Sequence, residues 1–206
     1  MHIVSVNVGK VTPLFAEADG ARSRVMSAIY KNSVSSLEDP RPVAVGWLGL
    51  EGDEQADPSV HGGRDKALYA YPAEHYPVWR TIRMQALALD EALPFGAMGE
   101  NLSISGVTES SLWIGDVISI GAADAPNVVV RVAAPRAPCF KLNARLGFRQ
   151  AAQMMVESGY TGFYLEVMQT GTLRAGDSLK VVPGERVVRV DEMHRLNTRG
   201  SRASRS

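Results

Sequence analysis

The chain contains one cysteine, in the segment Pro135-Arg-Ala-Pro-Cys139-Phe-Lys141. Between Asp124 and Glu157 there is no acidic residue, and five cations occur there: Arg131, Arg136, Lys141, Arg145 and Arg149. Nearby cations favour a thiolate, and so does a helix start, which we expect here because a short helix is predicted from Cys139 to Leu146. Such a thiolate could be a nucleophile, a persulfide carrier or a ligand for a soft metal. The alternative is a small buried apolar side chain.

A second candidate for chemistry is the segment His61-Gly-Gly-Arg-Asp-Lys66. The consecutive glycines Gly62 and Gly63 let backbone N–H groups converge on an anion, and the neighbouring arginine and lysine add positive charge. The residue spacing of a Walker phosphate-binding loop is absent. A tight turn without a ligand is the alternative interpretation.

Carboxylates and a histidine also occur at a spacing that metal ligands use on a helix. Asp53, Asp57 and His61 are four residues apart, which would place them on one helix face. Pro58 interrupts that helix, so the sequence does not favour a metal site there. The other histidines have no partner at a recognisable spacing, and we expect them at the surface: His2, His75 and His194.

The third candidate is a polar pair after a flexible loop, in Gly96-Ala-Met-Gly-Glu-Asn-Leu102. Glu100 could act as a general acid or base, and Asn101 could be a hydrogen-bonding ligand. An equally acceptable interpretation is a capped turn that enters a strand.

Strand patterns dominate the elements that must position these residues. Alternating or β-branched runs predict strands over residues 4–8, 66–71, 128–134 and 163–168. Two segments, 114–120 and 175–181, each contain a Gly-Asp turn followed by an alternating strand, so we interpret Asp116 and Asp177 as turn residues. Helices are predicted from Pro72 or Pro77 to about Leu89, over 147–158, and over about 191–196. The pattern predicts a mainly-β barrel with a few helical insertions and a short C-terminal helix.

Composition excludes several classes of protein. Among 206 residues, 45% are hydrophobic and 21% charged, as in a globular protein, and no apolar run approaches the ~20 residues that span a bilayer. One cysteine cannot form an internal disulfide, which favours a cytoplasmic location. The last 12 residues carry four of the 22 cations and no acid, which leaves 18 cations against 22 acids in the rest. We therefore expect neither a nucleic-acid nor a membrane partner.

The candidate segments, taken in order, resemble one known family. The motifs are Gly52-Asp-Glu-Gln-Ala-Asp57, His61-Gly-Gly-Arg-Asp-Lys-Ala67, Tyr71-Pro-Ala-Glu-His-Tyr76, Gly99-Glu-Asn-Leu102, Ile114-Gly-Asp116 and Pro135-Arg-Ala-Pro-Cys139. Together they closely resemble the YiiM-type MOSC-domain proteins, MOSC being the C-terminal domain of molybdenum cofactor sulfurases. The resemblance runs from Ser5-Val-Asn-Val-Gly9 to about Val182.

The resemblance implies a MOSC β-barrel over residues 1–183 that binds a molybdenum cofactor of the molybdopterin type. Residues 184–206 would be a truncated helical extension with a disordered Arg/Ser tail. The family's molybdenum-binding cysteine matches Cys139. The cofactor-binding residues that carry over are Lys31, His61, Gly62, Gly63, Asp65, Lys66, Asn101, Arg136 and Cys139. A dithiolene already holds the metal in such a cofactor, so one protein thiolate is sufficient, and no pyridoxal phosphate is required.

The resemblance also implies a reaction, the reduction of N-hydroxylated purines and related N-hydroxy compounds as a detoxification step. The implied catalytic residues are Cys139, His61 and Glu100, with either His61 or Glu100 as the proton donor. A flavin-dependent reductase would supply the electrons. The alternative is a carrier of sulfur or of the cofactor, using a Cys139 persulfide or thiolate.

Overall fold

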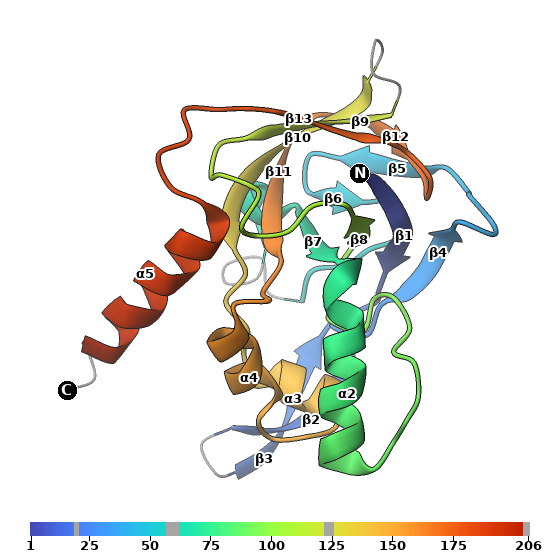
Figure 1. Cartoon of the computed structure of the whole chain (residues 1–206). Helices are drawn as coiled ribbons and strands as arrows, with labels where there is room; N and C mark the ends of the chain where they lie inside the picture. The colour runs from blue at the N-terminus through green and yellow to red at the C-terminus, as the bar shows by residue number, and fades with distance from the viewer. Residues whose placement is uncertain (19–20, 57–61, 122–125, 204–206) are drawn as a thin grey trace.

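The computed structural model describes residues 1–18, 21–56, 62–121 and 126–203. Its centre is an eight-stranded sheet that curls into a half-barrel (Figure 1). In sheet order the strands are β13 (Leu179–Val182), β9 (Val117–Gly121), β10 (Pro126–Pro135), β11 (Phe163–Gln169), β7 (Leu68–Pro72), β8 (Leu102–Ser105), β1 (His2–Val8) and β4 (Asn32–Ser36). Adjacent strands in this sheet are antiparallel, except that β7 and β8 run parallel.

Two smaller sheets complete the β-structure. One contains β12 (Gly171–Leu173), β5 (Val43–Gly46) and β6 (Gly49–Leu50), and the other is the hairpin of β2 (Thr12–Ala18) and β3 (Ala21–Ser27). Within the described ranges, the helices are α2 (Tyr76–Leu87), α3 (Lys141–Leu146), α4 (Ala151–Ser158) and α5 (Val190–Ala203), with short 3-10 turns η1 (Arg64–Lys66) and η2 (Ala73–His75). The predicted mainly-β fold with few helices is therefore confirmed.

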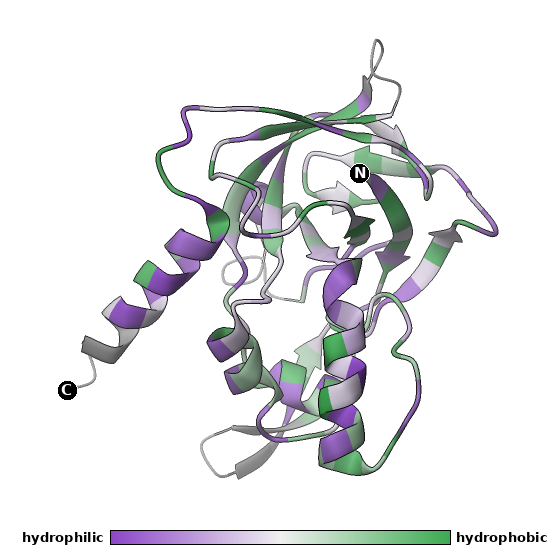
Figure 2. Cartoon of the chain, viewed as in Figure 1, coloured by the Kyte–Doolittle hydropathy of each residue, from purple (hydrophilic) through white to green (hydrophobic). Residues whose placement is uncertain are grey.

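The protein has two hydrophobic cores, one enclosed by the curled sheet and one formed mainly by the helices. The first lies inside the curled sheet, where the inward residues of β10 and β11, such as Val130 and Leu165, are buried. The second lies where α2, α3 and α4 pack at one end of the sheet, around Trp79, Met98 and Leu142. Figure 2 shows apolar stretches along the central strands and mostly hydrophilic residues along α5.

The predicted turns have the expected chemistry. Asp116 accepts a hydrogen bond from the Trp113 N–H at 3.0 Å, and Asp177 accepts one from the Arg174 N–H at 2.9 Å. Each aspartate closes the turn before a strand, β9 or β13, as the Gly-Asp pattern indicates.

Some predicted boundaries were wrong. The helix expected over residues 147–158 begins only at Ala151, because Gly147 has a left-handed backbone (φ +87°) and ends α3 instead. The predicted C-terminal helix, 191–196, continues to Ala203, through residues that composition assigned to a disordered tail. An i,i+4 contact from Arg195 to Asp191 (2.8 Å) supports its first turns.

The expected surface position of two histidines was also wrong. His75 and His194 are each 7% exposed. In the described part of the chain, no helix is long and apolar enough to cross a membrane.

Candidate functional site

A pocket of about 110 Å³ lies where loops that follow β3, β6 and β10 meet the start of β8. The parallel pairing of β7 with β8 aligns Ala70 with Leu102, which places the Gly99–Asn101 segment beside Tyr69. The described lining residues are Ser27, Ala28, Ile29, Lys31, Asp53, Glu54, Gln55, Ala56, Lys66, Tyr69, Gly99, Asn101, Arg136, Ala137, Cys139, Lys141 and Tyr164.

The carboxylate of Asp53 joins three segments at one side of this pocket. It forms an ion pair with Lys31, and both side chains are less than one-tenth exposed. It also accepts hydrogen bonds from the Gly9 N–H and from Asn101 Nδ2, each at 2.8 Å. Burial lowers the pKa of Lys31, and Asp53 opposes that change, with a weaker contribution from Glu100. The charge of Lys31 is thus directed to Asp53.

Asn101 and Glu100 have different surroundings although they are adjacent in the chain. Asn101 lines the pocket, and its Oδ1 accepts a hydrogen bond from the Tyr69 N–H at 3.1 Å. Glu100 is fully buried and does not line the pocket. Its carboxylate accepts hydrogen bonds from the hydroxyls of Tyr76 and Ser103 and from the N–H groups of residues 96 and 98. The side chain therefore fixes the loop that leads to Asn101 and β8.

Two tyrosines and two cations form one wall of the pocket. The Arg136 guanidinium lies 4.8 Å from the ring centre of Tyr69, and Lys66 Nζ lies 5.9 Å from that of Tyr164. Arg136 is 7% exposed. Burial raises the pKa of both phenols, and Arg136 opposes that change, so the two tyrosines are neutral at pH 7.

Cys139 is a free, partly exposed thiol on the same wall. It precedes α3, whose Leu142 N–H donates to the Cys139 carbonyl at 2.9 Å, so the short helix predicted here is present, although it begins at Lys141. Cys139 also lines a second, open hollow of about 680 Å³ between the 135–140 segment, α4 and α5. Cys139 thus borders both the pocket and a wider hollow beside it.

The charges and donors of the pocket fit a group that combines an anion with a soft metal. Among the described residues, four cations and two carboxylates line the pocket, but Asp53 pairs with Lys31, and Glu54 pairs with Lys10 at 3.2 Å. In the described ranges, no three His, Cys, Asp or Glu side chains gather as a metal cage. A metal that is already held by a dithiolene needs only one thiolate from the protein, and a phosphate group on the same molecule needs cations nearby. The pocket offers the thiol of Cys139 and several cations.

The predicted site residues are only partly gathered in this pocket. Its lining contains Lys31, Lys66, Asn101, Arg136 and Cys139. Asp65 is exposed on η1 and does not line the pocket, while His61 is outside the described residues.

The two glycines reach the pocket indirectly, through Gln55. Its Oε1 accepts a hydrogen bond from the Gly63 N–H at 3.4 Å, which places Gly62 and Gly63 beside the rim. Sequence reasoning missed Gln55, Tyr69, Tyr164 and Asp53 as site residues. For Asp53 the signal was present in the motif Gly52-Asp-Glu-Gln-Ala-Asp57, but it was examined only as a metal ligand.

Comparison with known proteins identifies the family of this chain. The family model for the MOSC domain matches residues 57–180. Protein YiiM of Escherichia coli is 42% identical over 176 residues, which cover 80% of this chain and 75% of that protein. A protein of Gibberella moniliformis named "Reductase" is 34% identical over 158 residues, which cover 77% of this chain and 26% of the fungal protein.

A solved structure shows the same fold. The crystal structure of YiiM from Geobacillus stearothermophilus superposes with a TM-score of 0.70 at 28% identity, covering 95% of this chain and 83% of the other. The family match over residues 57–180 includes β7 through β12 and Cys139. From the family match, the sequence identity and the shared half-barrel, this chain is a MOSC-domain protein of the YiiM type.

Proposed function

We propose that the pocket binds a molybdenum cofactor of the molybdopterin type, with Cys139 as the protein ligand to the metal, and that the protein reduces N-hydroxylated purines and related compounds. The observation that carries this proposal is one partly exposed thiol on a pocket wall that also presents Arg136, Lys66 and Lys141. The MOSC family and the relative named "Reductase" support it.

The cofactor, when bound, supplies two-electron redox chemistry. Conversion of R–NHOH to R–NH₂ consumes two electrons and two protons, breaks the N–O bond and releases water. We propose that a flavin-dependent reductase is the source of the electrons. The work of the protein is to bind the group, orient it and supply protons.

The residues divide this work by their positions. Lys66, Lys141 and Arg136 would attract the phosphate, while the hydrogen bonds among Asn101, Asp53 and Lys31 hold other lining segments in place. Because the carboxylate of Glu100 is enclosed by four donors, we assign it to loop positioning rather than to proton transfer. His61 is retained as the proposed proton donor.

The experiment is a turnover assay on protein produced in a host that makes the cofactor. Loaded protein is mixed with a hydroxylaminopurine and an artificial electron donor, and the aminopurine is quantified by chromatography. We expect turnover by the wild type and none above background by Cys139→Ser. Absence of turnover by cofactor-loaded wild type would reject the reductase proposal.

A carrier of sulfur is the second candidate, and one observation favours it. Cys139 also lines the open hollow beside α4 and α5, through which a partner could approach the sulfur. Incubation with a cysteine desulfurase and cysteine, followed by mass spectrometry, tests this. Addition of one sulfur atom in the wild type but not in Cys139→Ser supports a carrier, and no addition rejects it.

A further inference from the structure

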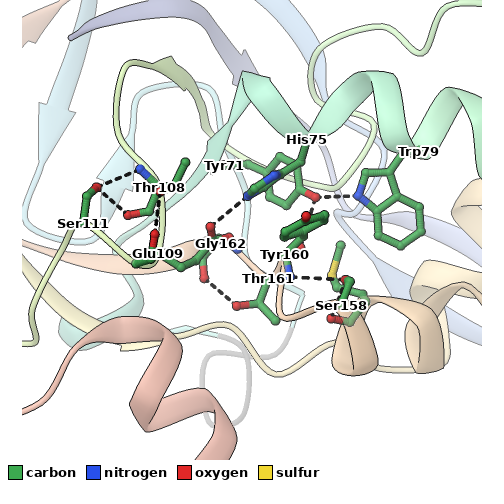
Figure 3. A network of polar contacts seen from close by, with 12 residues as sticks. Tyr71, His75, Trp79, Thr108, Glu109, Ser111, Ser158, Tyr160, Thr161 and Gly162 are labelled. Carbon is green, nitrogen blue, oxygen red and sulfur yellow. Dashed lines mark hydrogen bonds and ion pairs between the residues drawn. The ribbon is translucent and has the colours of Figure 1, made fainter.

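A buried histidine–glutamate pair lies outside the lining of the pocket (Figure 3). His75 Nε2 is 2.8 Å from Glu109 Oε2, and the two side chains are 8% and 5% exposed. The Tyr160 ring stacks on the His75 ring, with centroids 4.0 Å apart and planes 11° apart. Burial of such a pair is costly unless further hydrogen bonds satisfy it, so the remaining contacts of the carboxylate indicate what it holds.

The second oxygen of Glu109 leads to the pocket wall. Glu109 Oε1 accepts a hydrogen bond from the Gly162 N–H at 2.7 Å, as Figure 3 shows. The Gly162 carbonyl in turn accepts one from the Arg136 N–H at 3.2 Å. A single residue, Gly162, therefore links the buried carboxylate to the backbone of the arginine that lines the pocket.

The same segment also fixes the aromatic partner of that arginine. The Tyr69 hydroxyl donates to the Thr161 carbonyl at 2.7 Å, and the Tyr71 hydroxyl donates to the Tyr160 carbonyl at 3.0 Å. Residues 160–162 thus hold both Tyr69 and Arg136. The Arg136 guanidinium lies 4.8 Å from the centre of the Tyr69 ring.

There is little free space for this segment to adjust. Gly162 has φ +64°, and a Cβ placed on it would be 2.4 Å from the Ala70 carbonyl oxygen. Because backbone atoms pack this closely, a displacement of Gly162 cannot be absorbed locally and would pass to its neighbours.

We propose that His75 and Glu109 are positioning residues that hold Gly162, and through it Arg136 and Tyr69, in the geometry that gives the Cys139 pocket its positive wall. The inference rests on the proposed function for the purpose of the pocket, but its test requires no cofactor. Its failure is therefore distinguishable from failure of the reductase proposal.

The single cysteine provides the probe. The thiol of the purified, cofactor-free chain is treated at pH 7 with dithiobis-nitrobenzoate, which carries two negative charges, and separately with uncharged dithiodipyridine. The ratio of the two rates reports the positive potential at the sulfur, whereas a general loosening of the fold raises both rates. We expect Glu109→Ala to lower the ratio of anionic to neutral rates by at least about threefold.

Two further variants make the test specific. Glu109→Gln keeps an oxygen for the Gly162 N–H and should restore most of the ratio. Asp116→Ala is the matched control, because Asp116 is an equally buried carboxylate that accepts the N–H groups of Trp113 (3.0 Å) and Gly184 (2.8 Å) away from the pocket. Its ratio should equal that of the wild type.

An unchanged ratio in folded Glu109→Ala, or an equal decrease in Asp116→Ala, would overturn the proposal. If Glu109→Ala does not fold, the same ratio of reaction rates is measured in His75→Asn. A lowered ratio in that variant supports the positioning role, and an unchanged ratio rejects it.

Discussion

Replacement of Asp53 by alanine should destabilise the protein strongly, and more than removal of its partner Lys31. The Asp53 carboxylate accepts from Lys31, from the Gly9 N–H and from Asn101 Nδ2, so it keeps two donors when the ammonium is gone. Among the described residues, the buried Lys31 ammonium donates to Asp53 itself. Loss of one member of a buried pair costs about 3–5 kcal/mol when it leaves an uncompensated charge.

The magnitudes follow from these contacts. We expect Asp53→Ala to lower the free energy of unfolding by about 3–5 kcal/mol, and Lys31→Met to lower it by about 1–2 kcal/mol because the carboxylate remains hydrogen-bonded. In the double variant the buried ammonium is absent. Its free energy of unfolding should therefore exceed that of Asp53→Ala by at least about 1 kcal/mol.

Urea denaturation followed by tryptophan fluorescence measures these differences, since Trp79 is only 1% exposed. The control is Asp90→Ala, which breaks an exposed pair with Arg80 at 2.8 Å and should cost less than about 1 kcal/mol. The reasoning is refuted if Lys31→Met is the more damaging single change, or if the second substitution adds to the loss instead of reducing it.

Three further outcomes are expected. The pKa of Lys31 is lower in the folded protein than its ordinary value, so in the alkaline range below pH 10.5 the unfolded chain binds more protons than the folded one. The free energy of unfolding of wild type relative to Lys31→Met should therefore rise with pH in that range. A fall with pH would contradict the assignment. Gly162→Ala should lower the free energy of unfolding, measured by urea denaturation, by at least about 3 kcal/mol. Gly176→Ala should lower it by about 1 kcal/mol, because φ is also positive there but no atom lies within 4 Å of the added Cβ. Equal losses would show that the close approach at Gly162 is unimportant. Arg136→Lys should weaken binding of inorganic phosphate severalfold in calorimetry, and unchanged affinity argues against a role in anion binding.

The sequence predicted the strands that alternate or carry β-branched residues, because side-chain burial on the sheet follows that pattern. β1 shows where the rule breaks down. Ser5 and Asn7, the polar residues of the alternating pattern, are fully buried, and the Ser5 hydroxyl donates to Asn7 Oδ1 at 2.8 Å. The hairpin of β2 and β3 was missed because its apolar residues do not alternate regularly with polar ones, and β5 and β6 were missed because they are only a few residues long.

The candidate site divides in a similar way. Cys139 and Arg136 were identified because they are close together in the chain, and their local composition carries the signal. The contacts of Asp53 with Lys31 and Asn101 span tens of residues, so no spacing rule could reveal them. His75 and Glu109 are 34 residues apart in the chain and meet only in the folded structure. The sequence therefore placed His75 at the surface, although it is buried against Glu109.

Molybdenum content is the most direct measure of the central claim. The metal is quantified by mass spectrometry in wild type and in Cys139→Ser, both purified from a host that makes the cofactor, with Asp116→Ala as a variant outside the pocket. We predict stoichiometric molybdenum in wild type and in Asp116→Ala, and loss of most of the metal in Cys139→Ser. Wild type without molybdenum, or Cys139→Ser that retains it unchanged, would contradict the assignment of Cys139 as the metal ligand.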